Sequence, residues 1–252
     1  MRPSSISILP IAVLSVLLAL PAVSRAQSGG RGFHPPQQVG AGGGAHAGML
    51  QVSLPEIDAR LRAMGLEGLE EWLMLYGGGG SLQRGHWQIG GAGYGGSTEQ
   101  TVVSGETLRS ARLDLGYGGL TLGYVKAAGS LKLTLGTLLG IGSMELTLRR
   151  TPEAPASWAD LWEEYEAGSP PGPVDPGDLR LSTRLTGNWF AVEPFVDVRY
   201  WLVPLVAVEL SAHYHLGSIG GGKLEQNGVA IPGSPELDLS GMGFRVGLFI
   251  GF

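Results

Sequence analysis

The sequence predicts an all-β fold: a closed antiparallel transmembrane β-barrel of about eight strands, preceded by a short N-terminal helix. Three observations lead to this prediction. Apolar and polar residues alternate over long stretches after residue 70, which is the period of a strand with two different faces. Tight turns such as KAAGS alternate with long loops. The chain ends in FRVGLFIGF, whose large apolar side chains share one parity. All three features are typical of strands that cross a bilayer.

The first 26 residues have the organisation of a secretory signal peptide. Arg2 provides a positive start, the apolar run ISILPIAVLSVLLALP follows, and the small residues Ser24 and Ala26 precede the expected cleavage site. The alternative, a retained membrane anchor, is disfavoured because the run is short and contains Pro10. We therefore predict that 1–26 is a signal peptide and that the rest of the chain is exported.

The composition excludes several classes of function. The first 26 residues hold two arginines and no acidic residue, so the rest carries 15 basic and 22 acidic side chains, a net charge of −7. Nucleic acid is not an expected partner, because phosphate contacts need clustered Lys and Arg. The chain has no cysteine, which excludes disulfides and thiolate chemistry. After the leader, no apolar run approaches the ~18 residues of a membrane helix, so a membrane would be crossed by strands.

Two segments precede the predicted sheet. Residues 27–50 are rich in Gly, Pro and Gln and are predicted to be a flexible segment. Residues 51–69 contain LPEIDARLRAMG, whose apolar residues recur at helical spacing, with Pro55 in a first turn and Gly65 as a stop. We predict an amphipathic helix there and the outer-membrane-type barrel over 70–252.

The strand count leaves one question open. Seven long strands are clear, whereas single-chain bacterial barrels have an even number. Either an eighth strand lies within 108–126 or 219–231, or the 54–66 segment threads the lumen. We expect eight strands.

The alternation also predicts which face each strand presents to lipid. In 190–202 and 205–216 one parity is apolar and the other is charged or polar. Earlier strands repeat the pattern with changes of phase near GYGG, GIGS and TGN. A β-bulge, which shifts the register by one residue, is expected at each of these glycine-containing sites.

The inward parity is predicted to collect five basic and five acidic side chains. They are Arg112, Asp114, Lys132, Glu145, Arg149, Glu193, Asp197, Arg199, Glu209 and Arg245. Buried charges must be paired, and the interior of an eight-stranded barrel is about wide enough to be filled by side chains. The prediction is therefore a salt-bridged, filled lumen. The alternative is a charged path for small solutes.

One strand face carries the components of a hydrolase. Glu209, Ser211, His213 and His215 follow one another at two-residue spacing, and acid, hydroxyl and imidazole make up a nucleophilic triad. Residues two apart on a strand lie about 6–7 Å apart, however, which exceeds hydrogen-bond reach. Polar filling of the lumen is therefore favoured, and a barrel hydrolase using Ser211 and His213 is the alternative. Two histidines are too few for a metal site, so no metal or cofactor is predicted.

Two further motifs stand out. Residues 91–96, GAGYGG, match G-x-G-x-x-G, but the sequence after them is not helical, so close strand packing is expected instead of a nucleotide site. Residues 157–168, SWADLWEEYEAG, begin with the capping pair Ser157 and Asp160 and contain an apolar stripe. We predict a helix on an outer loop that closes over the barrel mouth as a lid; the alternatives are a helix that binds an extracellular partner and one that lies at the membrane interface.

Together these features resemble small bacterial outer-membrane β-barrels of an uncharacterised Gly-rich type, over about residues 70–252. The most specific feature is the last strand, in which five large side chains share one parity. They are Phe244, Val246, Leu248, Ile250 and Phe252. The resemblance implies that these side chains face outer-membrane lipid and that the barrel-assembly machinery of a Gram-negative-type bacterium reads the final aromatic residue.

The resemblance supplies no activity. A structural or interaction role without catalysis is the favoured function, and a hydrolase or a narrow solute channel is the alternative. A soluble β-sandwich is the alternative fold.

Overall fold

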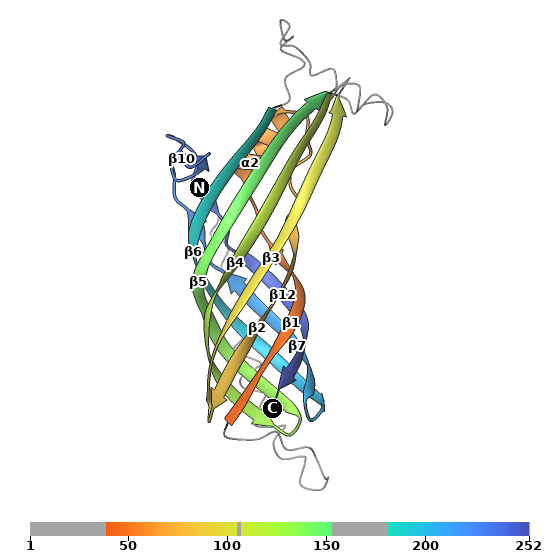
Figure 1. Ribbon diagram of the computed structural model, residues 1–252, viewed down its shortest axis with the longest axis vertical. Helices are drawn as coiled ribbons and strands as arrows, with labels where there is room; N and C mark the ends of the chain where they lie inside the picture. Colours follow the sequence, from red (N-terminus) through yellow and green to blue (C-terminus); the bar gives the residue numbers. More distant parts are fainter. Residues whose placement is uncertain (1–38, 105–106, 153–180, 252) are drawn as a thin grey trace, which may run out of the picture.

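Eight long strands close into an antiparallel barrel in the computed structural model, which describes residues 39–104, 107–152 and 181–251 (Figure 1). Each strand pairs with the next one along the ring, and β12 pairs with both β7 and β1, which closes it. The strands are β1 (Val39–Gln51), β2 (Trp72–Arg84), β3 (Trp87–Ser104), β4 (Thr107–Ala128), β5 (Leu131–Pro152), β6 (Leu181–Val203), β7 (Val206–His215) and β12 (Gly241–Gly251). The predicted eight-stranded barrel is confirmed. The predicted signal peptide, residues 27–38, the 157–168 segment and Phe252 lie outside the described residues.

The eighth strand is β1, within the segment predicted to be flexible. It pairs with β2 over its full length and with β12 from Gly42 to Leu50, so the prediction of a flexible segment over 27–50 is wrong from residue 39 onward. Its sequence, VGAGGGAHAGMLQ, is mostly Gly and Ala, which are depleted in strands. Neighbouring side chains explain this composition. A Cβ on Gly42 would lie 2.4 Å from the Phe249 ring, and one on Gly48 would lie 2.6 Å from Arg245 Cγ.

The two ends of the barrel differ in their connections. At one end, tight turns join β2 to β3, β4 to β5 and β6 to β7; Gly85 and Gly129 occupy two of these turns with φ of +60°. We call this the short-turn end. At the other end, the long-loop end, residues 52–71 join β1 to β2 and residues 216–240 join β7 to β12. In outer-membrane barrels short turns are periplasmic and long loops extracellular.

Four of the strands are much longer than the others. β3 to β6 have 18, 22, 22 and 23 residues, whereas β1, β2, β7 and β12 have 10 to 13. The long strands continue past the closed ring at the long-loop end as a four-stranded sheet (Figure 1). We call this sheet the extension.

The two faces of β5 exchange polarity along its length. In the barrel, Leu139 and Ile141 face outward with 48% and 73% of their surface exposed, while Lys132 and Thr134 are buried inside. In the extension the interior positions are Met144 and Leu146, at 1% and 3% exposed, and the outward positions are Glu145 and Arg149. The lower part of the strand therefore suits lipid outside, and the upper part suits water outside.

The exchange requires no change of register. β4 and β5 pair residue by residue from Thr107↔Pro152 to Ala128↔Leu131, and the β3–β4 and β5–β6 pairings are also continuous. The bulges predicted at GYGG, GIGS and TGN are therefore absent. The apparent changes of phase arise because apolar side chains turn from the outside to the inside while the side-chain direction continues to alternate normally.

A hydrophobic core fills the concave side of the extension. Helix α2 (Pro55–Ala63) buries Ile57 and Leu61, which belong to the same cluster of buried residues as Leu113 and Leu146 of the sheet. The connection from β7 to β12 adds four buried side chains and contains the short strands β8 (Ser218–Ile219), β9 (Glu225–Gln226), β10 (Val229–Ala230) and β11 (Leu237–Asp238). Those side chains are Ile219, Leu224, Leu237 and Leu239. The helix thus lies at the long-loop end. It has nine residues, and no helix in the described ranges is long and apolar enough to cross a membrane.

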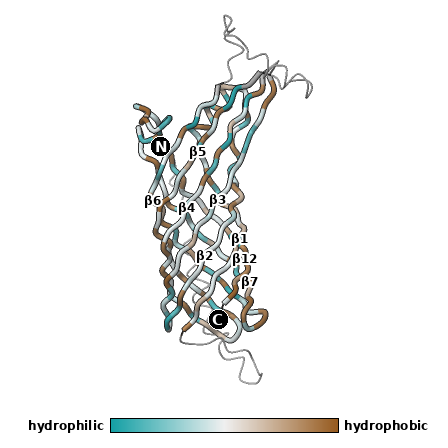
Figure 2. The backbone as a smooth tube through the Cα atoms, viewed as in Figure 1, coloured by the Kyte–Doolittle hydropathy of each residue, from teal (hydrophilic) through white to brown (hydrophobic). Residues whose placement is uncertain are grey.

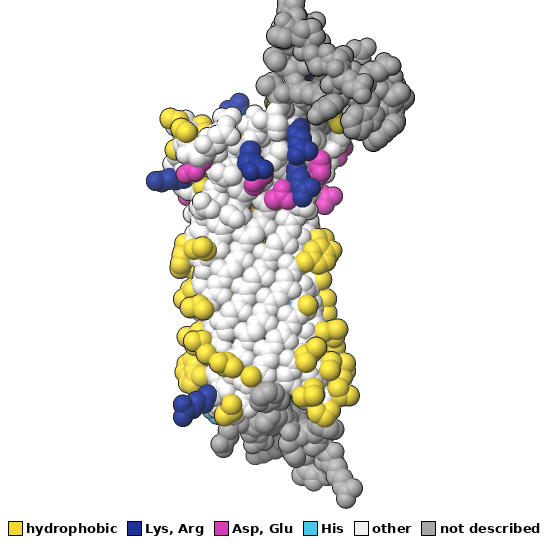
Figure 3. Space-filling model, viewed as in Figure 1, with side chains coloured by type: hydrophobic (Ala, Val, Ile, Leu, Met, Phe, Trp, Pro, Cys, Tyr) yellow, Lys and Arg dark blue, Asp and Glu magenta, His cyan; other side chains and the backbone are white. Residues whose placement is uncertain are grey.

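The outer surface divides into a lower apolar belt and an upper charged rim. Figure 3 shows large apolar side chains along the lower part of the molecule, with Lys, Arg, Asp and Glu gathered at the extension. Figure 2 shows hydrophobic and hydrophilic residues alternating along the strands. Leu120, Leu122 and Phe190 are among the belt residues, each at least half exposed. Such a belt on a closed barrel is the lipid-facing surface of a transmembrane β-barrel.

Candidate functional site: the polar interior of the barrel

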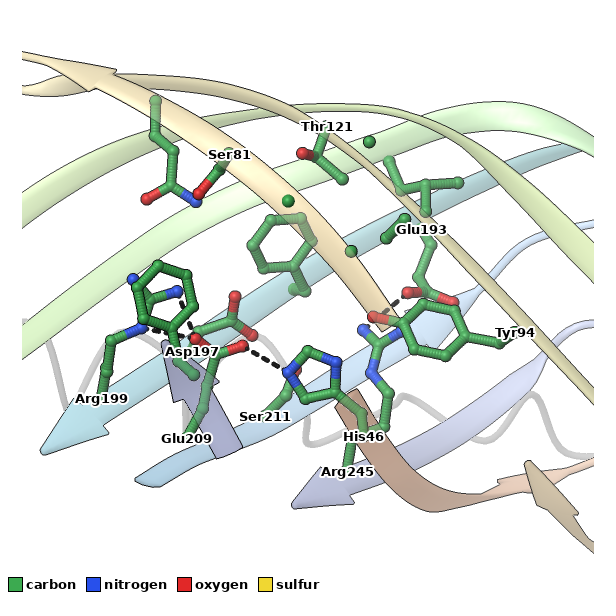
Figure 4. A pocket seen from close by; sticks show the side chains of 18 residues that line it. His46, Ser81, Tyr94, Thr121, Glu193, Asp197, Arg199, Glu209, Ser211 and Arg245 are labelled. Carbon is green, nitrogen blue, oxygen red and sulfur yellow. Dashed lines mark hydrogen bonds and ion pairs between the residues drawn. The ribbon is translucent and has the colours of Figure 1, made fainter. Parts of the chain in front are cut away.

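The lower barrel interior collects charged side chains and histidines from β1, β5, β6, β7 and β12, and Figure 4 labels several of them. Three are cationic and three are anionic, and three histidines lie among them. The charged residues are Lys132, Glu193, Asp197, Arg199, Glu209 and Arg245, and the histidines are His46, His213 and His215. Six of the ten residues predicted to form the lumen network therefore face inward, with equal numbers of each charge.

The upper cluster of this interior is built around the Glu193 carboxylate, which has no exposed surface. One oxygen accepts a hydrogen bond from Arg245 Nη2 at 2.8 Å, and the other accepts one from the Tyr117 hydroxyl at 2.6 Å. Arg245 in turn lies over the Tyr94 ring, 4.1 Å from its centroid. The carboxylate and guanidinium thus have the pairing and hydrogen bonds that a buried ion pair requires.

Two histidines surround the same carboxylate. Trp189 Nε1 donates to His215 Nε2 at 3.1 Å, which assigns the His215 proton to Nδ1. That Nδ1 lies 3.5 Å from Glu193 Oε2, and His213 Nε2 lies 3.9 Å from the same oxygen. The cluster therefore links β6, β7, β4 and β12 through one acid.

A second cluster lies nearer the short-turn end. Arg199 Nε donates to Glu209 Oε2 at 2.7 Å, Arg199 Nη2 also pairs with that carboxylate, and His46 Nε2 lies 3.0 Å from Glu209 Oε1. The Arg199 guanidinium stacks on the Phe249 ring at 3.4 Å. Lys132 donates to Gln83 Oε1 at 2.6 Å. This cluster joins β1, β6, β7 and β12, so it fixes the seam at which the barrel closes.

A small cavity of ≈50 Å³ separates the clusters and is lined by Asp197, Ser211 and Thr121 among others. Several buried polar atoms here have no hydrogen-bond partner within the described residues, including His46 Nδ1, Gln88 Oε1, Ser211 Oγ and Arg245 Nη1. A polar cavity of this size holds a few water molecules. It is far smaller than the ~300 Å³ at which ligand pockets begin.

Glycines on neighbouring strands make room for the large interior side chains. A Cβ on Gly243 would lie 2.2 Å from His213 Nε2, one on Gly247 2.0 Å from the His46 ring, and one on Gly142 2.2 Å from the Trp189 ring. No real Cβ approaches that closely, so a large side chain on one strand requires glycine beside it. This is one physical reason for the 43 glycines in the chain.

The four hydrolase candidates do not form a triad. Glu209, Ser211, His213 and His215 all face inward, but Glu209 pairs with Arg199, and His215 lies between Trp189 and Glu193. Among the described residues, neither the Ser211 hydroxyl nor either His213 nitrogen has a hydrogen-bond partner. Residues 91–96 lie within β3, not at the start of a helix. No group of three or more metal-ligating side chains forms among the described residues.

Four residues predicted for the lumen lie on the outside instead. Arg112 and Asp114 form a bidentate pair on the outer face of the extension, and Arg184 pairs with Glu145 there at 2.9 Å. Arg149 is exposed on the same face. Hydrogen bonds and charge from Asp114 raise the pKa of Arg112. The predictions for Arg112, Asp114, Glu145 and Arg149 are wrong because they assumed that apolar residues face outward along the whole strand.

The last strand presents its large side chains to the outside, as the resemblance implies. Phe244, Val246, Leu248 and Ile250 are 49–65% exposed. The opposite parity points inward and supplies Arg245 and Phe249, both nearly buried.

Sequence reasoning missed four interior residues: His46, Tyr94, Tyr117 and Trp189. The signal for the two tyrosines was available, because each is a single aromatic residue within a run of glycines, in GAGYGG and GYGG. His46 was missed because it lies in the segment 27–50, which was predicted to be flexible.

Replacing Glu193 tests whether the upper ion pair stabilises the barrel. We expect Glu193→Gln to lower the free energy of unfolding by about 3–5 kcal/mol, because it leaves the buried Arg245 charge uncompensated. The measurement is guanidinium unfolding in liposomes. The control Glu145→Gln removes one partner of a partly exposed ion pair and should cost about 1 kcal/mol or less. The double variant Glu193→Gln with Arg245→Met should recover much of the lost free energy of unfolding. The prediction would be contradicted if Glu193→Gln and the control Glu145→Gln lowered the free energy of unfolding equally.

The requirement for glycine beside large interior side chains gives a second prediction. Gly243→Ala should destabilise the barrel by about 1–3 kcal/mol, since its Cβ meets His213 at 2.2 Å and Met49 O at 2.7 Å. The control is Gly93→Ala, whose Cβ would have its nearest neighbour, Tyr117 O, at 3.6 Å. That variant should be neutral or slightly stabilising, because alanine loses less entropy than glycine. The requirement would be refuted if Gly93→Ala lowered the free energy of unfolding as much as Gly243→Ala in the same assay.

Comparison with known proteins gives similarity of fold only. No protein-family model matches the sequence, and no curated protein matches it. Among solved structures, Neisserial surface protein A is 10% identical with a TM-score of 0.45, over 84% of this chain and 97% of that one. Ail, the attachment invasion locus protein of Yersinia pestis, in complex with the heparin analogue sucrose octasulfate, is 10% identical with a TM-score of 0.43, over 85% and 99%.

The outer membrane protease OmpT from Escherichia coli is 11% identical with a TM-score of 0.30, over 86% of this chain and 97% of that one. These three are bacterial outer-membrane proteins. The chain is thus similar, at low identity, to solved structures of outer-membrane proteins.

Proposed function

We propose that the protein is a non-conducting, non-catalytic outer-membrane barrel that presents its extension as a protein-binding platform. The observation that carries this proposal is the extension itself. Its concave side is covered by α2 and the β7–β12 connection, which contribute buried apolar side chains to the hydrophobic core. Its outer face is charged and polar, as a water-exposed contact surface would be.

A channel is disfavoured by the interior. Glu193 has no exposed surface, Arg199 and Arg245 are at most 7% exposed, and the cavity between them is ≈50 Å³. Above this layer the interior is apolar, with Leu50 and Leu73 at 0% and 1% exposed. An ion crossing the barrel would have to break buried ion pairs and then leave its hydration shell among leucines, which is costly.

A hydrolase is disfavoured because no accessible nucleophile lies next to a base in the described part of the interior. The inward histidines His213 and His215 are buried at 5% and 0% exposed. A general base must come within hydrogen-bond reach of the nucleophile it activates, and among the described residues the Ser211 hydroxyl has no hydrogen bond to either ring.

The upper part of β3 is the part of the extension that is best suited to bind a protein segment. β3 pairs with β2 only as far as Tyr76↔Gly95, but with β4 as far as Ser104. From Ser97 to Ser104 the β2 side of the strand therefore has no strand partner among the described residues. An open edge offers unpaired backbone N–H and C=O groups, which extended peptides recognise by adding a strand.

Two other contacts are proposed on the strength of the sequence. The predicted helix at 157–168 lies, in sequence, between Pro152 of β5 and Leu181 of β6. An extracellular partner there fits the platform role. The terminal strand fits recognition by the barrel-assembly machinery, and the belt fits outer-membrane lipid.

The experiment has a conductance arm and a contact arm. Purified protein in planar bilayers should give no stepwise KCl conductance; open-channel steps would overturn the proposal. For contact, a photo-reactive amino acid at Thr101 on the β3 edge is compared with one at Thr186 on the outer face of β6. On intact cells exposed to an extracellular protein mixture, we expect adducts from position 101 in clear excess over position 186. Equal labelling at both positions would contradict a specific edge.

A further inference from the structure

The outer surface near the short-turn end carries a cluster of basic and aromatic side chains. Arg84 ends β2, Trp87 begins β3, and Tyr124 and Lys126 lie near the end of β4. Cross-strand pairing places Arg84 beside Trp87, and Trp87 beside Tyr124. All four side chains point outward and are exposed.

The aromatic side chains of this cluster hold one another in place. The Trp87 and Tyr124 rings meet edge to face with centroids 5.8 Å apart, and His86 stacks on Tyr124 at 5.5 Å. His86 Nδ1 lies 3.1 Å from the carbonyl oxygen of Val125, and Val125 N donates back to His86 O at 2.8 Å. The turn therefore presents a fixed aromatic surface between two cations. Trp and Tyr in such positions mark the headgroup level of a bilayer.

An apolar groove begins directly at this cluster. It has a volume of ≈340 Å³ and is lined by Val39, Ala41, Leu82, Ile89 and Leu122, with Arg84 and Trp87 at its end. A second groove of ≈420 Å³ shares Leu82 and Ile89 and continues over the backbone of Gly80 and Gly90. Together they form a furrow that runs along β1, β2 and β3 on the lipid-facing surface. A furrow of this kind fits an acyl chain.

The charged side chains on the outer surface near the short-turn end are all positive. The outward side chains of the described residues below the extension include Arg84 and Lys126 and no Asp or Glu. On the extension, by contrast, Arg112 and Arg184 are each paired with an acid. The charge of the cluster is therefore available to a ligand. Arginine binds phosphate oxygens with two parallel hydrogen bonds, and lysine adds a point charge.

We propose that this surface, the basic–aromatic cluster with its furrow, is a binding site for an anionic phospholipid of the leaflet at the short-turn end. Arg84 and Lys126 bind the phosphate, Trp87 and Tyr124 contact the glycerol region, and one acyl chain lies in the furrow. The site rests on membrane embedding of the barrel but is independent of what the extension binds.

The test is lipid retention in native mass spectrometry. Delipidated full-length mature protein in detergent is given phosphatidylglycerol or phosphatidylcholine of the same chain length. The wild type should retain more phosphatidylglycerol than phosphatidylcholine. Arg84→Gln with Lys126→Gln should reduce its retention roughly tenfold, to the level of phosphatidylcholine. Ala41→Phe, which fills the furrow, should reduce retention of both lipids.

A matched control separates the site from general charge attraction. Arg60→Gln with Lys223→Gln removes two exposed charges at the long-loop end. This variant should keep the preference for phosphatidylglycerol. Heat-dependent gel mobility verifies that each variant is folded. The proposal is overturned if the wild type shows no preference for phosphatidylglycerol, or if the variant Arg84→Gln with Lys126→Gln keeps that preference. It is also overturned if the control variant loses as much phosphatidylglycerol retention as the Arg84→Gln with Lys126→Gln variant does. None of these results would bear on conductance or on contacts at the β3 edge.

Discussion

Strands β4 and β5 pass from a lipid-facing belt into a water-facing extension without changing their pairing, and this change of surroundings constrains the rest of the structure. Below the boundary the outer positions are apolar and the inner ones are mostly polar. Above it, Leu113 and Leu115 lie inside while Arg112 and Asp114 lie outside. The pleat fixes only that alternate residues point to opposite faces. Which face is apolar depends on the solvent, so one unbroken strand can satisfy both environments.

The inversion explains why the two halves of the interior are built so differently. The extension has water outside and therefore needs an apolar core, which α2 and the β7–β12 connection complete. The lower barrel already presents its apolar residues to lipid, so the residues left for its interior are largely polar. Those polar groups are buried, and they are stabilised by pairing, as Glu193 with Arg245 and Glu209 with Arg199 show. Both halves are therefore filled by side chains, the lower barrel by paired polar groups and the extension by apolar ones.

Local pattern was sufficient for the strands of the last third. β6, β7 and β12 contrast large apolar residues with charged ones, so the outward positions of Phe190, Leu210 and Val246 could be read from parity alone. Pattern failed for β1, where Gly and Ala fill both faces because the neighbouring strands supply the large side chains. It also failed for Arg149 and Glu145, because parity gives no sign of where the membrane ends. His46 could not be matched with Glu209, 163 residues away, without knowing that β12 and β1 close the ring. Such cross-strand partners depend on register, which is a property of the whole sheet.

The most direct test of the inversion is spin-label accessibility along the outer face of β5. The chain has no native cysteine, so single cysteines can be placed at 135, 139, 141, 145 and 149 and labelled with a nitroxide in liposomes. The account predicts high accessibility to oxygen and low accessibility to a water-soluble nickel complex at positions 135 to 141, and the reverse at 145 and 149. A label at Leu146, inside the extension, should be shielded from both. Oxygen-dominated accessibility continuing through 149, or nickel accessibility at 135 to 141, would contradict it.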